Sequence, residues 1–179
     1  LGYFKFRNTV NPFGIIFNPV SIEKLLSRAI NQVEFTEADI FFHNERWHCF
    51  EVHSDVSHAN KEVCLAILNE MLQHLHDQLA TATHIILTYG TSWVYRHKAS
   101  QLVVANCHKV PQVQFDKEIL SIDTIAKSIQ NTIATIRKVN PNGLVLFTVS
   151  PVRHSKDGFV ENQRSKAHLI SAIHQILNL

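Results

Sequence analysis

Two short apolar runs that stop in small polar turns constrain this chain more than any other feature of its sequence. Residues 84–89 run into Gly90-Thr91-Ser92-Trp93, and residues 144–149 run into Ser150-Pro151-Val152-Arg153-His154. Apolar runs that end in turn residues are typical of buried parallel strands. In open α/β sheets, ligands bind in the crevice outside the carboxyl ends of the strands. We therefore expect function at these two turns.

Length and composition indicate one ordinary globular domain. The chain has 179 residues, of which 45% are hydrophobic and 18% are charged, so it is long enough to bury a core. Its formal charge of +2 is spread along the chain, whereas a nucleic-acid groove needs a concentrated basic stripe. No apolar stretch approaches the roughly 20 residues that a membrane span requires. We expect a small-molecule substrate, no nucleic acid and no membrane span.

The three cysteines predict free thiols rather than a disulfide framework. Cys49, Cys64 and Cys107 are odd in number and lack the short spacing of a zinc site. Reduced thiols are typical of a reducing compartment. The amino terminus also lacks a basic segment followed by an apolar one. We expect a cytoplasmic location.

Periodic apolar residues place helices before, between and after the two strands. Ser21 is the expected cap of a first helix. Further helices are predicted over residues 58–79, 121–139 and 162–177, the second of them capped by Ser121. Alternation near residues 41–53 predicts an inserted β-hairpin. Helices that alternate with strands in this way predict one α/β domain over residues 1–179, with a parallel sheet.

The two turns carry the first candidates for chemistry. Ser92 follows a strand end, but a Gly-x-Ser-x-Gly nucleophile elbow requires a second glycine where this chain has Val94. We therefore expect a turn in which Ser or Thr caps the next segment. Arg153 and His154 follow the second strand, where they would bind a carboxylate, a phosphate or a developing oxyanion. The alternative for this pair is a solvated surface turn.

A cysteine and four histidines offer weaker possibilities. Cys107 lies next to His108, but neighbouring side chains diverge, so a thiolate and its base are poorly placed there. The four histidines, which match no helical metal-binding spacing, are His43, His48, His53 and His58. Asp55 precedes His58 by three residues, yet it stands where a helix cap is expected. We expect no metal and no cofactor. A metal-dependent hydrolase that uses these histidines is a weaker alternative.

Four motifs in one order resemble the GSCFA domain family over essentially the whole chain. They are Asn11-Pro12-Phe13-Gly14-Ile15-Ile16-Phe17-Asn18-Pro19, Tyr89-Gly90-Thr91-Ser92-Trp93-Val94-Tyr95, Asn106-Cys107-His108-Lys109-Val110-Pro111 and Thr148-Val149-Ser150-Pro151-Val152-Arg153-His154, followed by Asp157-Gly158 and Ser165-Lys166-Ala167. That family is similar to the SGNH (GDSL-like) esterases. The resemblance implies a flavodoxin-like, three-layer α/β/α sandwich with a mostly parallel sheet, incomplete at both ends.

The resemblance also implies a chemistry and a set of residues. In those esterases a Ser at the end of the first strand attacks an ester, backbone N–H groups and an Asn side chain hold the oxyanion, and an Asp-x-x-His activates the Ser. The oxyanion donors implied here are Gly14, Gly90, Thr91 and Asn106. The implied substrate contacts are Asn11, Ser92, Trp93, His108, Ser150, Arg153 and His154. Ser92 stands where the wider group has an Asn, and Asn106 is expected to replace it.

The chain departs from the family pattern where the nucleophile belongs. No glycine is followed by Ser-Cys-Phe-Ala, and no Asp-x-x-His follows the last strand. The sequence begins with Leu1 and stops within the apolar residues 176–179, so we expect a piece of a longer protein. We predict that this piece is inactive alone and that its parent cleaves acyl esters of a carbohydrate or small metabolite. The alternative is a non-catalytic module that binds a sugar or a partner through Trp93, Arg153 and His154.

Overall fold

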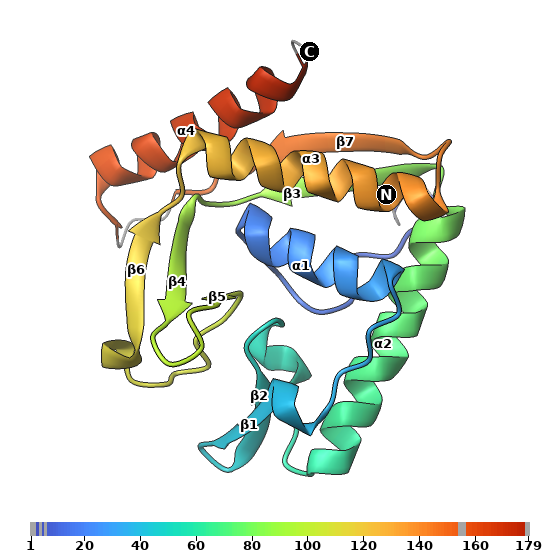
Figure 1. The fold of residues 1–179 in the computed structure, drawn as a ribbon, viewed down its shortest axis with the longest axis vertical. Coiled ribbons are helices and arrows are strands. Elements are labelled where there is room, and N and C mark those ends of the chain that lie inside the picture. Colours follow the sequence, from blue (N-terminus) through green and yellow to red (C-terminus); the bar gives the residue numbers. More distant parts are fainter. Residues whose placement is uncertain (1–2, 4, 6, 154–156, 178–179) are drawn as a thin grey trace.

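A pair of parallel strands lies against a layer of helices in the computed structural model, which describes residues 3, 5, 7–153 and 157–177 (Figure 1). The elements in chain order are α1 (Pro19–Ile30), η2 (Glu37–Asp39), β1 (Ile40–His43), β2 (Arg46–Cys49), η3 (Ser54–Val56), α2 (Lys61–Thr81), β3 (His84–Tyr89), β4 (Trp93–His97), β5 (Val103–Val104), η4 (Gln112–Gln114), β6 (Phe115–Ile119), α3 (Ile122–Val139), β7 (Leu144–Val149) and α4 (Phe159–Leu177).

The parallel pair is formed by β3 and β7, the two runs from which the sequence predicts strands. They pair in parallel from His84 opposite Leu144 to Tyr89 opposite Val149, which confirms a parallel sheet. One face of the pair is covered by helices. Ile85 packs in one buried cluster with residues of α1, α2 and α3, and Tyr89 packs in a second cluster with residues of α3 and α4. The helices α1 and α3 begin at the edge where the two strands end, and α4 passes the end of β3 at Ser165 and Lys166 (Figure 1).

The opposite face of the β3–β7 pair is open. Ile86, Leu144 and Leu146 are 50%, 49% and 40% exposed. The hydroxyls of Thr88 and Thr148, 2.8 Å apart, lie on the same exposed face. Parallel sheets are almost always covered on both faces. The described residues therefore form two layers at this pair, where the family resemblance implies three.

The other strand pairs are antiparallel. The strand β4 lies between β5 and β6 and pairs antiparallel with both, and β1 and β2 form an antiparallel hairpin over residues 40–49. These strands belong to two sheets of their own, separate from the parallel β3–β7 sheet. The strand β4 is not a parallel neighbour of β3, because residues 90–92 are too few for the crossover that a parallel partner needs. The chain turns out of the parallel pair into β4 instead.

The first helix begins earlier than its predicted cap. Asn18, not Ser21, is the cap, and its side-chain oxygen accepts a hydrogen bond from the Ser21 N–H at 2.8 Å. Pro19 supplies the first helical position, where its fixed φ suits the helix and its missing N–H is not needed. The prediction for α3 is confirmed, since Ser121 Oγ accepts from the Thr124 N–H at 3.1 Å.

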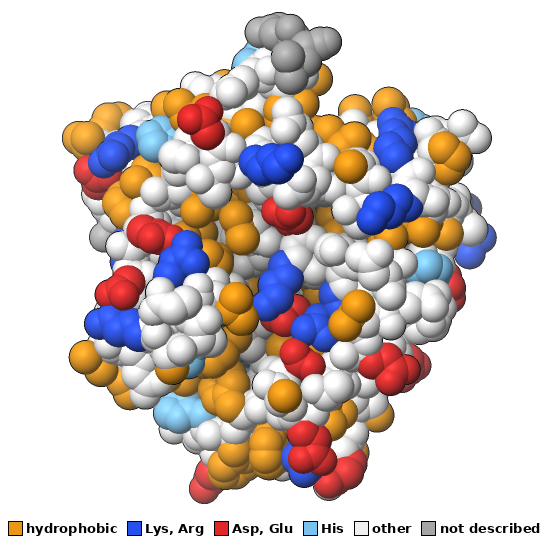
Figure 2. Space-filling view, viewed as in Figure 1, with side chains coloured by type: hydrophobic (Ala, Val, Ile, Leu, Met, Phe, Trp, Pro, Cys, Tyr) orange, Lys and Arg blue, Asp and Glu red, His pale blue; other side chains and the backbone are white. Residues whose placement is uncertain are grey.

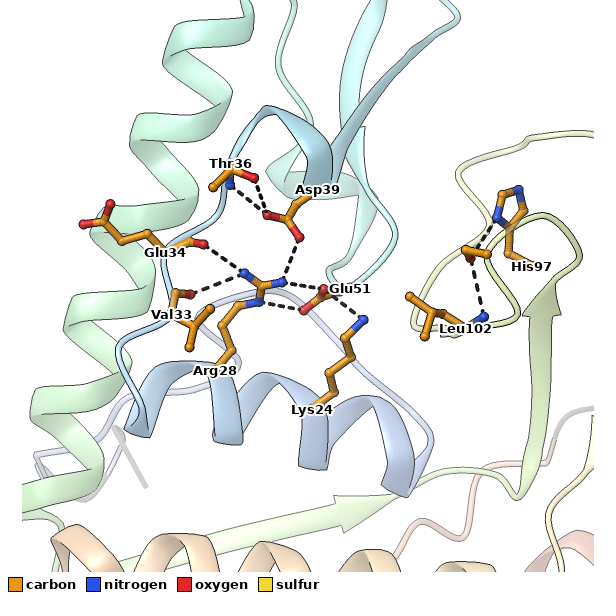
Figure 3. Close-up of polar contacts among 10 residues, drawn as sticks. Lys24, Arg28, Val33, Glu34, Thr36, Asp39, Glu51, His97 and Leu102 are labelled. Carbon is orange, nitrogen blue, oxygen red and sulfur yellow. Dashed lines mark hydrogen bonds and ion pairs between the residues drawn. The ribbon is translucent and has the colours of Figure 1, made fainter.

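Arg28 joins α1 to the end of the hairpin. Its Nε and Nη2 donate to the two carboxylate oxygens of Glu51 at 3.0 and 2.9 Å, and Nη2 also donates to Asp39 at 2.8 Å (Figure 3). Lys24 lies 3.0 Å from the same Glu51 carboxylate. Burial would raise the pKa of Asp39, but the N–H of Thr36 and the Arg28 guanidinium hold that pKa below its usual value. Two cations and two carboxylates thus form a partly buried junction between α1 and the hairpin.

On the face shown in Figure 2, Lys and Arg side chains are interspersed with Asp and Glu rather than gathered into one stripe. Among the described residues, no helix combines the length and the apolar character that crossing a bilayer would require.

Candidate functional site

The turns that follow β3 and β7 lie next to each other. The Ser150 N–H donates to the carbonyl of Tyr89 at 2.8 Å, so the first residue after β7 is bonded to the last residue of β3. Residues 90–92 and 150–153 therefore share one edge of the molecule. The amino-terminal ends of α1 and α3 lie close to this edge, since Phe17 bonds to Gly90 and Leu120 bonds to Ser92, and a helix amino terminus carries partial positive charge.

The turn after β3 is held by the carbonyl of Phe17. This oxygen accepts from the Gly90 N–H at 2.7 Å and from the Thr91 N–H at 3.2 Å. A side chain at position 90 would not fit, because a Cβ there would lie 2.9 Å from the Phe17 ring. The motif containing Phe17 and the motif containing Gly90, far apart in sequence, thus meet at the strand end.

Ser92 is a structural residue in this arrangement. It is fully buried, its N–H donates to Ser165 Oγ at 2.8 Å, and its hydroxyl donates to the Ser165 carbonyl at 3.1 Å. Thr91 Oγ1 also lies 3.0 Å from Ser165 Oγ. These bonds fasten the turn to α4, and they leave the Ser92 hydroxyl out of reach of a substrate. Within the turn itself the capping side chain is Thr91, whose Oγ1 accepts from the Trp93 N–H.

Lys166, next to Ser165, is buried at the same turn. It is only 9% exposed, and its ammonium group donates to the Gly90 carbonyl. Burial lowers its pKa, and it forms no ion pair with a carboxylate in the described part of the chain. Tyr89, the residue before Gly90, has a buried hydroxyl with no hydrogen-bond partner among the described atoms. Burial raises the pKa of this hydroxyl. Two buried polar side chains thus lie at the end of β3.

Trp93 extends the edge toward α4. Its backbone N–H donates to Thr91 Oγ1 at 3.0 Å, and its indole N–H donates to the Glu161 carbonyl at 3.3 Å. The ammonium of Lys117 lies 4.9 Å from the centre of the indole ring and pairs with Asp157. The ring is therefore partly covered by a cation of its own chain.

Gly14 belongs to a different contact. Its φ is +77°, and a Cβ there would lie 2.3 Å from the Cβ of His53. Its N–H donates to the Asn11 carbonyl at 2.8 Å, and the Phe13 carbonyl accepts from the His53 N–H at 3.0 Å. Glycine is thus required to pack this segment against η3, and its amide is already used inside the segment.

Asn106 and His108 face the β1–β2 hairpin. The Asn106 side-chain oxygen accepts from the His108 N–H at 2.8 Å. His108 is 3% exposed, with Nε2 2.7 Å from the Cys49 carbonyl and its ring 4.7 Å from that of His48. Burial lowers the pKa of His108 to about 4 and raises the pKa of Cys107 to about 11. Both groups are therefore neutral near pH 7.

Ser150 and Arg153 lie after β7. Ser150 is half-buried and its hydroxyl accepts from the Val152 N–H at 3.3 Å, whereas Arg153 is exposed. His154, expected beside Arg153, lies outside the described residues. Among those residues, no group of three His, Cys, Asp or Glu side chains is arranged to hold a metal ion.

The model of the GSCFA family matches residues 1–179. The chain belongs to the GSCFA family. No match was found among curated proteins or among solved structures.

The GSCFA motifs are brought together only in part. The structure joins Gly90, Thr91 and Ser150 at the end of β3 and β7, with Trp93 beside them. Gly14 packs against η3, and Asn106 and His108 pack against the hairpin. The implied roles of these residues as oxyanion donors or substrate contacts remain predictions.

Sequence reasoning missed Lys166. The Ser165-Lys166-Ala167 motif marks its place, but a lysine within a predicted amphipathic helix is normally solvated. The one signal was the pair of small residues on either side of it, which allows a close approach between α4 and the turn after β3. Only the three-dimensional arrangement shows that its amine reaches the Gly90 carbonyl.

Proposed function

We propose that this GSCFA chain forms the oxyanion-binding and substrate-binding part of an ester hydrolase with an SGNH-like, three-layer fold. The observation that carries the proposal is the bond between Ser150 N–H and the Tyr89 carbonyl at 2.8 Å. This bond holds the carboxyl ends of two neighbouring parallel strands side by side. Ligand sites in open α/β sheets lie at the carboxyl ends of the strands.

The open face of the β3–β7 pair supports a three-layer fold. Within the described residues β3 pairs only with β7, and one face of the pair exposes Ile86, Leu144 and Leu146. A parallel pair with free outer edges and an apolar open face has the character of the centre of a wider sheet with helices on both sides. In our proposal, segments outside these 179 residues supply the missing strands and the missing layer.

The same proposal assigns the nucleophile to a segment outside the chain. The family's Gly-Ser-Cys-Phe-Ala motif does not occur in the sequence, and the Ser92 hydroxyl is buried and bonded to Ser165. The chain contributes N–H donors near Thr91 and the exposed cation of Arg153. A cation and oriented N–H groups at this edge would stabilise the negative charge that develops on an ester carbonyl oxygen.

The test is hydrolysis of an activated acetate ester by the complete protein. We expect hydrolysis that is lost when the Ser of its Gly-Ser-Cys-Phe-Ala motif is replaced by Ala. We also expect Arg153→Met to reduce it, whereas Lys138→Met, an exposed lysine in α3, should not. Hydrolysis by residues 1–179 alone that Ser92→Ala or His154→Ala abolishes would count decisively against the proposal.

A non-catalytic binding module is the second candidate, and one observation favours it. The amides of Gly14, Gly90 and Thr91 all donate to carbonyls of their own chain, as they would in a fold that has no reaction to support. A complete protein that binds a sugar or an acyl ligand at this edge, with no hydrolysis of the activated ester, would establish this alternative.

A further inference from the structure

The peptide between Gly90 and Thr91 is held from both sides. Its carbonyl accepts from the buried ammonium of Lys166, and its N–H points toward the Phe17 carbonyl. Because a trans peptide is planar, its C=O and N–H point in opposite directions. Lys166 and Phe17 therefore lie on opposite sides of the same peptide group.

The two N–H groups that meet the Phe17 carbonyl are not held equally. Gly90 N–H donates at 2.7 Å, whereas Thr91 N–H donates at 3.2 Å to the same oxygen. Gly90 is buried, while Thr91 and Phe17 are not. The Thr91 N–H thus makes the longer of the two bonds to a shared acceptor, and it belongs to the less buried of the two residues. It can turn to another acceptor without leaving the Phe17 oxygen unpaired.

The ammonium on the far side strengthens this donor. Hydrogen bonds in a chain polarise one another, and a charged donor on a carbonyl draws electron density from the N–H of the same peptide. Lys166 is buried and lacks a carboxylate partner among the described residues, so its charge is not cancelled locally. Ser165 fixes the position of Lys166 through its bonds to Ser92.

We propose that Lys166 is a positioning residue that polarises the Gly90–Thr91 peptide, so that the Thr91 N–H donates to a tetrahedral oxyanion at the end of β3. Lys166 does not touch the anion; it acts through the peptide. The inference rests on the proposed function, because an ester hydrolase needs such a donor for the negatively charged oxygen of its intermediate.

The test uses methylphosphonate as a stable tetrahedral anion and the ¹⁵N–¹H signal of Thr91 in the complete protein. We expect the Thr91 signal to move and saturate as methylphosphonate is added. Lys166→Met should weaken this binding about tenfold or more, because the variant removes a charged donor. Lys138→Met, which also removes one positive charge but from an exposed site, should leave the binding unchanged.

Two results would overturn the inference: a Thr91 signal that does not respond in the wild-type chain, or an equal response in Lys166→Met. If circular dichroism shows that Lys166→Met does not fold, the wild-type chain is titrated by the ³¹P shift of the probe at rising pH. Binding should weaken as the ammonium loses its proton below the usual lysine pKa of 10.5. Binding independent of pH in that range would also overturn the inference.

The outcome is separate from that of the hydrolysis assay. If the complete protein fails to cleave the activated ester while Thr91 still responds to methylphosphonate in a way that depends on Lys166, the proposed hydrolase activity is refuted and the proposed anion-binding role of Thr91 is supported. If the complete protein hydrolyses the ester but Thr91 does not respond, the hydrolase activity is supported and the proposed role of Lys166 is refuted.

Discussion

Acid should loosen the contact between the loop at residues 105–110 and the β1–β2 hairpin, because His108 is buried there in its neutral form. Its Nε2 lies 2.7 Å from the Cys49 carbonyl, and its Nδ1 is buried with no partner among the described atoms. A second proton would have to be placed on this buried ring, where the cost of burial outweighs the favourable effect of the Cys49 and Val52 backbone groups. The titratable groups that lower its pKa are His48 and His53, which are bases themselves and offer a new proton no compensation.

The magnitude follows from the pKa of His108. Burial lowers it from 6.5 to about 4, and each unit corresponds to about 1.4 kcal/mol. The unfolded chain therefore takes up this proton more readily than the folded chain. The stabilisation is complete above pH 6.5 and is lost as the pH falls toward 4, by about 3 kcal/mol in all. His48, whose pKa burial also lowers, adds to the loss in the same direction.

The assay is urea unfolding at several pH values between about 7 and 4. His108→Gln keeps a neutral N–H donor but cannot titrate, so its free energy of unfolding should fall less steeply with acid than that of the wild type. His84→Gln, at an exposed position in β3, is the control and should keep the wild-type slope. Equal slopes for His108→Gln and the wild type would refute the argument that burial keeps His108 neutral.

Three further substitutions test the packing around the site. Gly14→Ala should lower the free energy of unfolding by about 3 kcal/mol, since it combines a left-handed φ with a Cβ 2.3 Å from that of His53; a loss below about 1 kcal/mol in a urea titration would contradict this. Arg28→Met should cost about 1 to 3 kcal/mol because Glu51, 10% exposed, loses its bidentate partner and keeps only Lys24, and the double variant with Glu51→Gln should recover part of it. Ser165→Ala should cost about 1 to 3 kcal/mol by leaving buried groups of the turn unpaired, and should raise hydrogen exchange in that turn more than in α3.

The sequence predicts the parallel pair well because its signal is local. The runs at 84–89 and 144–149 are short, apolar and bounded by turn residues, and the structure confirms both as strands in one parallel pair. The antiparallel β4 and β6 are harder to predict. Trp93–His97 carries polar residues such as Arg96, which pairs with Glu118 across the strands, so its side chains do not show one apolar face.

The site is predicted in place but not in detail. Turn residues at strand ends point to residues 90–92 and 150–153, and the structure joins these segments. Sequence alone does not show that Ser92 is fully buried, because its partner Ser165 is 73 positions away in the chain. Sequence alone also does not show that Gly14 packs against His53, away from the strand end where Gly90 lies. Contacts between distant segments decide both points.

The fastening of the turn after β3 to α4 has a consequence for how the protein matures during synthesis. A ribosome releases Gly90 and Ser92 long before Ser165 and Lys166, so in the nascent chain the polar groups of the turn bond to water until α4 emerges and docks. The edge that we propose for anion binding is therefore completed late, and a chain that stalls before α4 would display β3 and β4 without a formed recognition surface.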